Sequence, residues 1–190
     1  MYDSFLSIRE DVAERLAQGA SSRHSAMHLP AVATADCDIR IMVLRAFDPA
    51  LWQLRFHTDV RSPKVGTIEE NGSVGVLFYD RNAKVQIRVR GSGTVIRQGP
   101  EVDRIWEESS NFARRCYVGH GPGTETNHPS SGLPEWIEGR QPTDEELVPA
   151  RENFAVLRVS IAQADWFYLS NEGHRRAVIA PDGRGRWVTP

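Results

Sequence analysis

The sequence has few cysteines and no long hydrophobic run, and each of these absences excludes a class of protein. Two cysteines, Cys37 and Cys116, are too few for a disulfide framework and lack the paired spacing of a zinc site, so we interpret both as reduced thiols. No apolar run approaches the roughly 20 residues that a bilayer requires, and the first residues lack a basic segment followed by an apolar one. We therefore expect a cytoplasmic protein that contacts no membrane.

A strong charge of either sign is also missing. The formal net charge is −2, which gives no broad positive field and argues against a general nucleic-acid binder. The histidines at 28, 57, 128 and 174 show no metal-ligand spacing, and a lone histidine is more often structural than a ligand. We expect neither a metal ion nor a nucleic-acid partner.

What remains is an ordinary globular composition. Apolar residues make up 40% and charged residues 25% of the 190 positions, which suggests neither disorder nor a fibrous protein. A chain of this length fits one folded core. We expect a single domain spanning residues 1–190.

The first half of the chain begins with a helical pattern and continues with strands. Phe5, Ile8, Val12 and Leu16 lie at spacings of three and four, which predicts a helix over residues 4–18 with Gly19 as its C-terminal cap. Short turns then separate β-compatible runs, which predicts an antiparallel meander. The expected strands are residues 31–34, 38–47 and 51–58.

The second half contains further short strands and few helices. Residues 62–71 are expected to form an amphipathic helix, followed by a strand over 74–79 buried on both faces and a strand over 85–96 with one wet face. Two short helices are expected within residues 100–117, and a long surface loop over 119–149. The remaining expected strands are 154–160, 165–169, 176–180 and 186–188. This pattern favours a mainly β fold, a closed barrel with peripheral helices.

The first unusual segment carries an arginine at each end of four apolar residues. If residues 40–45 form a strand, Arg40, Met42 and Leu44 point to one face and Arg45 to the other. A cation placed among core positions requires an anion nearby.

A second polar cluster lies where a strand is expected to pass into a helix. Thr58, Arg61, Ser62 and Lys64 gather there, and the amide groups of a helix N-terminus suit a phosphate. One phosphate could satisfy both clusters. The alternative interpretation is a set of surface arginines beside an ordinary Ser N-cap.

Five motifs in this order resemble those of the pyridoxamine 5′-phosphate oxidase superfamily. Its flavin strand, R-x-V-V/L-L-K/R, is matched by residues 40–45, and its F-Y-T-N followed by S-x-K is matched by Phe56-His57-Thr58-Asp59 and Ser62-Pro63-Lys64. Residues 74–78 resemble V-x-L-L-F, and residues 84–91 resemble R-Q-V-x-V-x-G. A tryptophan precedes an arginine by ten residues near the C-terminus, as Trp166 and Arg176 do.

The resemblance implies an FMN-binding split β-barrel that works as a homodimer with the flavin between two subunits. It assigns the FMN phosphate to Arg40 and Lys64, with smaller contributions from Thr58, Arg61 and Ser62. It places Gln86 and Arg176 at the polar rim of the isoalloxazine and Trp166 beside the ring. The full set of implied cofactor residues is Arg40, Met42, Val43, Leu44, Arg45, Thr58, Arg61, Ser62, Lys64, Gln86, Trp166 and Arg176. The alternatives are a solvent-facing strand residue for Gln86 and a core residue for Trp166.

The substrate motifs of the vitamin-B6 enzyme are not preserved. Its C-terminal R-x-H-x-R becomes residues 172–176, where Glu172 replaces the first arginine, and residues 105–115 contain no equivalent of its substrate-phosphate motif. We therefore do not expect oxidation of pyridoxamine 5′-phosphate. Candidate substrate-binding residues are His174, Arg45 and Arg114.

These observations leave three functional hypotheses. The first is an FMN-dependent oxidoreductase acting on an unknown small molecule. The second is a flavin-binding module without turnover. The third is a related split-barrel protein that binds haem or a deazaflavin.

Overall fold

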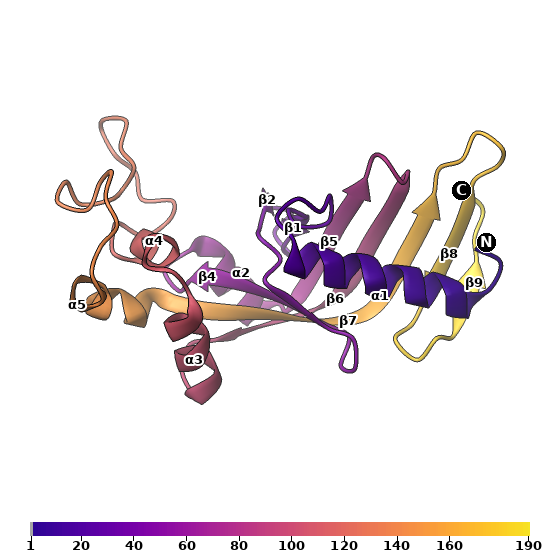
Figure 1. Cartoon of the computed structure of the whole chain (residues 1–190), viewed down its shortest axis with the longest axis horizontal. Coiled ribbons are helices and arrows are strands. Elements are labelled where there is room, and N and C mark those ends of the chain that lie inside the picture. The colour runs from indigo at the N-terminus through magenta and orange to yellow at the C-terminus, as the bar shows by residue number, and fades with distance from the viewer. Residues whose placement is uncertain (1) are drawn as a thin grey trace.

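A computed structural model describes residues 2–190, in which nine strands form one antiparallel sheet and helices flank it (Figure 1). The strands are β1 (Ala31–Ala33), β2 (Ile39–Ile41), β3 (Ala46–Asp48), β4 (Gln53–Asp59), β5 (Ser73–Asp80), β6 (Val85–Ile96), β7 (Phe154–Tyr168), β8 (Arg175–Ile179) and β9 (Gly185–Trp187). The helices are α1 (Phe5–Ser21), α2 (Pro63–Glu70), α3 (Pro100–Glu108), α4 (Asn111–Arg114) and α5 (Asp144–Leu147), with short 3-10 helices η1 (Arg115–Tyr117) and η2 (Val148–Asn153).

The long strand β7 organises the sheet. It pairs with β6 along one edge, while its other edge pairs first with β4, over residues 154–160, and then with β8, over residues 164–168. The full strand order is β2-β1-β5-β6-β7-β4-β3, with β8 and β9 continuing from the second half of β7. Figure 1 shows β7 running between the two ends of an elongated molecule. The expected mainly β, split-barrel fold is confirmed.

Helix α1 covers the strands at one end of the molecule (Figure 1). Ser4 caps its N-terminus, and Ile8, Val12 and Leu16 are completely buried against the sheet. The predicted helix is therefore confirmed, but the prediction of Gly19 as its cap is wrong. The helix continues to Ser21, so Gly19 lies inside it. Glycine is needed at this position because an added Cβ would stand 2.8 Å from the Cβ of Met27.

Residues 38–47 form two short strands instead of the single predicted strand. Between β2 and β3 the backbone leaves the ladder, where Met42 N–H donates to the carbonyl of Pro30 and Leu44 N–H to that of His28. The predicted alternation of side chains nevertheless holds. Met42 and Leu44 are buried, whereas Arg45 is exposed.

The prediction that strand β5 is buried on both faces is wrong for this chain. Leu77 and Tyr79 are 41% and 49% exposed. Ala31 pairs with both Leu77 and Ile41, so these side chains project from the same side of the sheet. We call this side of β1, β2, β5, β6, β7 and β8 the open face.

Strand β7 replaces two predicted strands with one of 15 residues. Arg90 of β6 pairs with Gln163, but Gly91 pairs with Ile161, so Ala162 is an extra residue at a β-bulge. Gly91 is required there, since an added Cβ would lie 2.1 Å from the carbonyl oxygen of Ser160.

A second, smaller core lies at the other end of the molecule. It joins residues of α3, η1, α5 and η2 to the start of β7: Val102, Ile105, Trp106, Tyr117, Leu147, Ala150, Phe154 and Val156. The predicted loop over 119–149 is mostly irregular, but it contains α5 and the completely buried Ile137. Helix α5 begins at a capping box formed by Thr143 and Glu146. No helix within residues 2–190 is long and apolar enough to cross a membrane.

Candidate functional site

The structure gathers three of the five predicted phosphate-binding residues, Arg40, Thr58 and Lys64, around one cavity of about 300 Å³, which we call the cationic cleft. It lies between the segment before β3, the end of β4 and the first turn of α2. Six of the predicted cofactor residues line it: Arg40, Met42, Val43, Arg45, Thr58 and Lys64. Ile41, His57, Asp59, Cys116, Tyr117 and Pro122 complete the wall.

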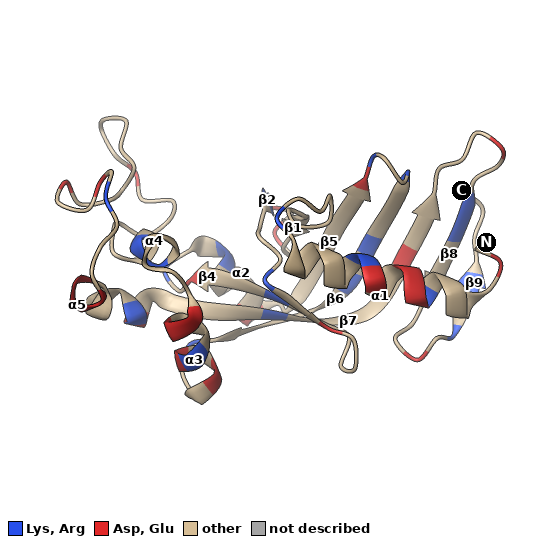
Figure 2. Cartoon of the chain, viewed as in Figure 1, with Lys and Arg blue, Asp and Glu red and all other residues tan. Residues whose placement is uncertain are grey.

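The cleft is a local concentration of positive charge. Figure 2 shows Lys and Arg residues interspersed with Asp and Glu over both ends of the molecule. Against this background, Arg40, Arg45 and Lys64 line one cavity with a single carboxylate, Asp59. Arg61 pairs with Asp59 and Asp38 pairs with Arg40, so Arg45 and Lys64 are the cleft cations without an ion pair among the described residues, and they favour an anionic ligand.

Lys64 lies at the first turn of α2 and points back toward Ser62. Its Nζ donates to Ser62 Oγ at 2.6 Å, and the Ser62 hydroxyl makes no capping bond to the helix. Burial lowers the pKa of Lys64, and the nearby Arg40 guanidinium lowers it further. A bound anion would relieve this repulsion between two cations.

Arg40 is held in place by the turn between β1 and β2. Its Nη1 donates to Thr34 Oγ1 at 2.9 Å and to the Val32 carbonyl at 3.4 Å, and its Nη2 pairs with the Asp38 carboxylate. These bonds fix the guanidinium at the cleft before a ligand arrives. They thereby reduce the entropy lost on binding.

The three other predicted phosphate contacts, Thr58, Ser62 and Arg61, differ in how closely they approach the cleft. Thr58 lines the cleft and is 4% exposed, whereas Ser62 does not line it but accepts a hydrogen bond from Lys64, which does. Arg61 does not line the cleft, because its guanidinium is bonded to Asp59 and to the carbonyls of Tyr117 and Gly119. Leu44 is completely buried in the core.

Gln86 and Arg176 lie together at the opposite end of the molecule. Phe167 pairs with both residues across three strands, so the two side chains share the open face. Arg176 donates to both carboxylate oxygens of Asp165, at 3.0 and 2.8 Å. Burial of Asp165 raises its pKa, but bonds from Arg176 and Arg88 outweigh this, so its pKa lies below the usual value. Neither Gln86 nor Arg176 lines the cationic cleft of its own chain.

Trp166 faces away from Gln86 and Arg176. It is completely buried, and its indole Nε1 donates to Asp11 Oδ2 of α1 at 2.8 Å. Because Trp166 is adjacent to Phe167 in β7, its ring projects to the covered side of the sheet. These surroundings are those of a core residue, which was the alternative interpretation of Trp166.

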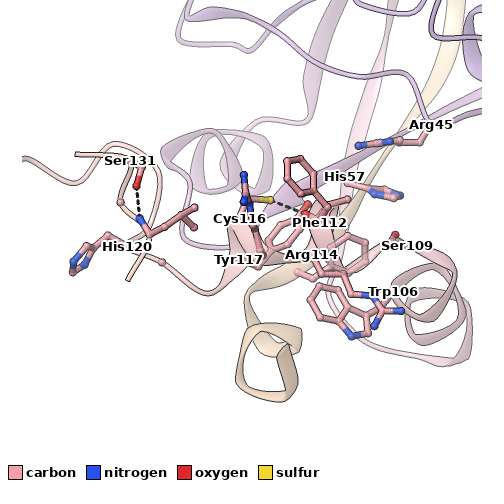
Figure 3. Close-up of a pocket in the computed structure, with 16 residues that line it drawn as sticks. Arg45, His57, Trp106, Ser109, Phe112, Arg114, Cys116, Tyr117, His120 and Ser131 are labelled. Atoms are coloured by element: carbon pink, nitrogen blue, oxygen red, sulfur yellow. Dashed lines mark hydrogen bonds between the residues drawn. The ribbon is translucent and has the colours of Figure 1, made fainter. Parts of the chain in front are cut away.

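A larger cavity of about 480 Å³ adjoins the cleft (Figure 3). The two cavities share Arg45, His57, Cys116 and Tyr117, so a ligand in one contacts the wall of the other. The remaining lining residues are Trp106, Ser109, Phe112, Ala113, Arg114, Arg115, Gly119, His120, Ser131, Gly132, Leu133 and Phe154. Within residues 2–190, no group of three His, Cys, Asp or Glu side chains is arranged to hold a metal ion.

His57 is a site residue that sequence reasoning did not assign to function. Burial, with Arg45 and Arg55 adding to it, lowers the pKa of His57 to about 3, so the imidazole is neutral at physiological pH. Its Nε2 is buried and has no hydrogen-bond partner among the described residues. One sequence signal could have identified His57 as a site residue. It directly precedes Thr58, a predicted phosphate contact, in the F-H-T-D motif.

The candidate substrate residues are not brought together. Arg45 lines both cavities. Arg114 lines the larger cavity but is only 9% exposed, and it donates to the Glu107 carbonyl and to Asp144. His174 is exposed beyond the end of β7, with its ring edge-on to Phe167 at 5.6 Å, outside both cavities.

The mainly β sheet is that of a split-barrel protein, and its cationic cleft groups Arg40, Arg45 and Lys64 around one cavity. Residues 8–97 match the family profile described as "Pyridoxamine 5′-phosphate oxidase, FMN-binding domain". The resemblance predicted from the motifs is confirmed over residues 8–97, which are similar to the FMN-binding domain of this family. A comparison with curated protein sequences gives no match.

Solved structures with the same fold include two that span nearly the whole chain. A pyridoxamine 5′-phosphate oxidase-related, FMN-binding protein from Nostoc punctiforme is 24% identical, with a TM-score of 0.71 over 96% of this chain and 97% of that one. PhzG from Burkholderia lata, solved with tetrahydrophenazine-1-carboxylic acid, is 18% identical, with a TM-score of 0.68 over 98% and 93%.

A third structure is more distant. A protein from Clostridium acetobutylicum, related to general stress protein 26 of B. subtilis, is 12% identical, with a TM-score of 0.55 over 90% and 93% of the two chains. At these identities the three likenesses establish the fold alone.

Proposed function

We propose that this protein is an FMN-dependent oxidoreductase that acts on a small molecule as a homodimer. The observation that carries the proposal is the cationic cleft, where Arg40, Lys64 and Thr58 converge on a cavity in a chain whose residues 8–97 match an FMN-binding domain. The phosphate of FMN is a dianion. The two adjacent cations match its charge, because Arg40 is fixed by hydrogen bonds and Lys64 is partly buried.

The chain's own residues would bind and orient the cofactor. Arg40 and Lys64 hold the phosphate, with Thr58 at the wall of the cleft. The isoalloxazine would extend toward the larger cavity, past Arg45 and His57, which the two cavities share. When bound, FMN supplies hydride transfer to or from a substrate, which no side chain can supply.

A second copy of the chain would complete the site. Gln86 and Arg176 lie on the open face, away from the cleft of their own chain, together with the exposed apolar residues Leu77 and Tyr79. A two-fold contact between open faces would cover these apolar side chains and bring polar groups of one chain toward the cleft of the other. This contact is expected to exceed roughly 1,000 Å², as a specific interface requires.

Cofactor identification tests the proposal directly. The protein is purified without added flavin, its absorbance spectrum is recorded, and the ligand released by denaturation is identified by mass spectrometry. We expect a flavin spectrum and the mass of FMN. A Soret band would show that the protein binds haem instead of FMN, and a deazaflavin mass would show that it binds a deazaflavin. FMN binding without reduction by a nicotinamide cofactor or by any substrate would favour a flavin-binding module.

A cytoplasmic location stays a prediction.

A further inference from the structure

A third cavity, of about 390 Å³, is formed by the β3–β4 hairpin, the first turn of α3 and β7, and we call it the hairpin cavity. The hairpin turn and α3 both lie below β7 in Figure 1. The hairpin cavity shares no lining residue with the cationic cleft or with the larger cavity. Its volume is that of a small-molecule site. It is lined by Ala46, Phe47, Asp48, Leu51, Gln53, Leu54, Arg55, Glu101 and Arg158.

Arg55 is a half-buried cation in this cavity without a partner of its own. Its side chain makes no hydrogen bond or ion pair within residues 2–190, and its Nε is buried. Arg55 pairs with Arg158 across β4 and β7, so two guanidinium groups project from opposite positions on one side of the sheet. Burial lowers the pKa of Arg55, and the opposing effect of the Glu101 carboxylate is smaller. An anion bound at Arg55 would offset both the burial and the repulsion.

The two carboxylates that line the hairpin cavity are already bonded to other groups. Glu101 Oε2 accepts from Arg158 Nη2 at 2.6 Å. Asp48 Oδ1 accepts from two backbone amides of the hairpin turn, at 2.8 and 3.0 Å. The lining therefore combines one cation that has no partner among the described residues with two nearby negative charges. This arrangement favours a ligand with a single negative charge over a ligand with two.

The hairpin turn adds an apolar surface to the same cavity. Ala46, Phe47, Leu51 and Leu54 all line it, and Leu51 is 65% exposed to solvent. An apolar group packed against Leu51 would remove this surface from water, which stabilises the bound state. A ligand that satisfies both parts of the cavity is therefore amphipathic.

We propose that the hairpin cavity binds a small amphipathic monocarboxylate, with its carboxylate on Arg55 and its apolar tail against Leu51. A guanidinium offers one carboxylate two parallel hydrogen bonds and an opposite charge. This binding site is separate from the one that we propose for FMN. The inference goes beyond the proposed function, because neither Arg55 nor Leu51 lines the cationic cleft or the larger cavity.

Titration with probe ligands tests the inference. Protein supplied with FMN is titrated at pH 8 with octanoate, octanamide and octyl phosphate, and dissociation constants are taken from changes in backbone amide NMR shifts. Octanoate is expected to bind at least about tenfold more tightly than octanamide, because the amide loses the charge-assisted pair. Octanoate is also expected to bind more tightly than the doubly charged octyl phosphate, because Asp48 and Glu101 repel the second charge.

Variants at arginine positions locate the carboxylate. Arg55→Gln is expected to reduce the preference for octanoate over octanamide to less than about threefold, since it removes the charged bonds. Arg97→Gln is the matched control and should keep the full preference, because Arg97 lies at an exposed pair with Glu69, outside the hairpin cavity. If Arg45→Gln removes the preference and Arg55→Gln does not, the carboxylate binds in the larger cavity and the inference is wrong.

A variant at the exposed apolar position tests the tail. Leu51→Ser is expected to weaken octanoate and octanamide by a similar factor of at least about threefold, because both have the same tail. Leu6→Ser is its control, since Leu6 is 62% exposed on α1. Thermal unfolding establishes that each variant is folded. If Arg55→Gln does not fold, Leu51→Ser still decides, because the side chain of Leu51 is mostly outside the core.

Three results would overturn the inference. They are equal affinity for octanoate and octanamide, tighter binding of octyl phosphate, and unchanged octanoate affinity in Leu51→Ser. Each of these results leaves the proposed function standing. Failure of the protein to bind FMN would refute the proposed function, while the same titrations of the flavin-free protein would still test the hairpin cavity.

Discussion

Arg61 holds the buried carboxylate of Asp59 through three hydrogen bonds. The backbone N–H and Nε of Arg61 donate to Oδ1 at 2.8 and 2.9 Å, and Nη2 donates to Oδ2 at 2.6 Å. The same guanidinium donates to the Gly119 carbonyl at 2.8 Å and the Tyr117 carbonyl at 3.3 Å. Arg61 therefore neutralises Asp59 and fastens the segment after η1 over the end of β4.

Removing Arg61 should lower the free energy of unfolding. The Asp59 side chain is 5% exposed, so Arg61→Ala leaves a buried charge without its partner, which costs about 3–5 kcal/mol of unfolding free energy. Chemical denaturation measures this loss. The double variant Asp59→Asn, Arg61→Ala should recover part of it, and Arg184→Ala, at an exposed pair with Asp182, should cost less than about 1 kcal/mol. A loss in Arg61→Ala no larger than in Arg184→Ala would contradict this role.

The cationic cleft predicts which residues set FMN affinity. Lys64→Ala and Arg40→Ala should each weaken FMN binding by about 1.5–3 kcal/mol, roughly 10- to 150-fold, because each removes charge-assisted bonds to the phosphate. Quenching of flavin fluorescence gives the dissociation constants. Arg97→Ala, at an exposed pair with Glu69, is the control and should retain the original affinity. If both cleft variants also retain it, the phosphate lies elsewhere.

The open face predicts a dimer that depends on its apolar residues. Tyr79→Glu should produce a monomer with weakened FMN binding, because a charge would be buried at the contact. Sedimentation velocity and flavin titration measure the two effects together. Leu6→Glu is the matched control, since Leu6 is 62% exposed on α1 rather than on the open face. A holo-monomer of the original protein would refute the shared site.

His57 predicts a dependence of stability on pH. Its folded pKa of about 3 lies below the ordinary 6.5, so between these values the unfolded chain binds more protons at this position. Stability should therefore fall as the pH decreases from 6.5, by up to about 1.4 kcal/mol per pH unit from this group.

Denaturation at pH 7, 6 and 5 tests this dependence, since most carboxylates titrate at lower pH. The variant His57→Phe should show a flatter profile. The control His128→Gln, in an exposed loop position, should follow the original protein. Parallel profiles for His57→Phe and the original protein would show that His57 is not held neutral.

FMN-loaded protein should turn over pyridoxamine 5′-phosphate slowly or not at all. Glu172 replaces a cation, and the region around Ile105 lies in α3, where Ile105 is buried and Glu107 and Glu108 are exposed. Losing two or three phosphate contacts of about 1.5–3 kcal/mol each lowers kcat/KM on the order of a thousandfold or more. Formation of hydrogen peroxide and pyridoxal phosphate is assayed beside an authentic oxidase. Turnover within about tenfold of that enzyme, a difference of ~1.4 kcal/mol, would show that pyridoxamine 5′-phosphate is a substrate and contradict this prediction.

Local patterns in the sequence predicted most of the fold. The stripe of Ile8, Val12 and Leu16 predicted α1, and the apolar Val65 and Ile68 with the Asn-Gly end predicted α2, because these signals act within one or two turns of helix. The errors concern contacts between distant segments. The sequence pattern wrongly predicts Gly19 as a cap, because the tight packing of Gly19 against Met27 cannot be inferred from neighbouring residues.

For the candidate site, too, local motifs were predictive and contacts between distant segments were not. The motif order predicted that Arg40, Arg45, Thr58 and Lys64 would meet, and they line one cavity. The larger cavity was missed because its wall combines α3, the segment around η1 and β7, whose approach depends on tertiary packing. The position of Arg61 was missed for the same reason, since its carbonyl partners are 56 and 58 residues away.

The bulge at Ala162 means that the two halves of β7 follow opposite phases of the polar and apolar alternation. In the first half the odd-numbered Leu157, Val159 and Ile161 join the main core, whereas in the second half the even-numbered Ala164 and Trp166 do so. Deleting Ala162 alone would restore a strict period of two and turn one half of the strand inside out. Because Ala162 is exposed, substitution of its side chain is expected to cost little, whereas loss of the residue is expected to disrupt the core on one side of the bulge.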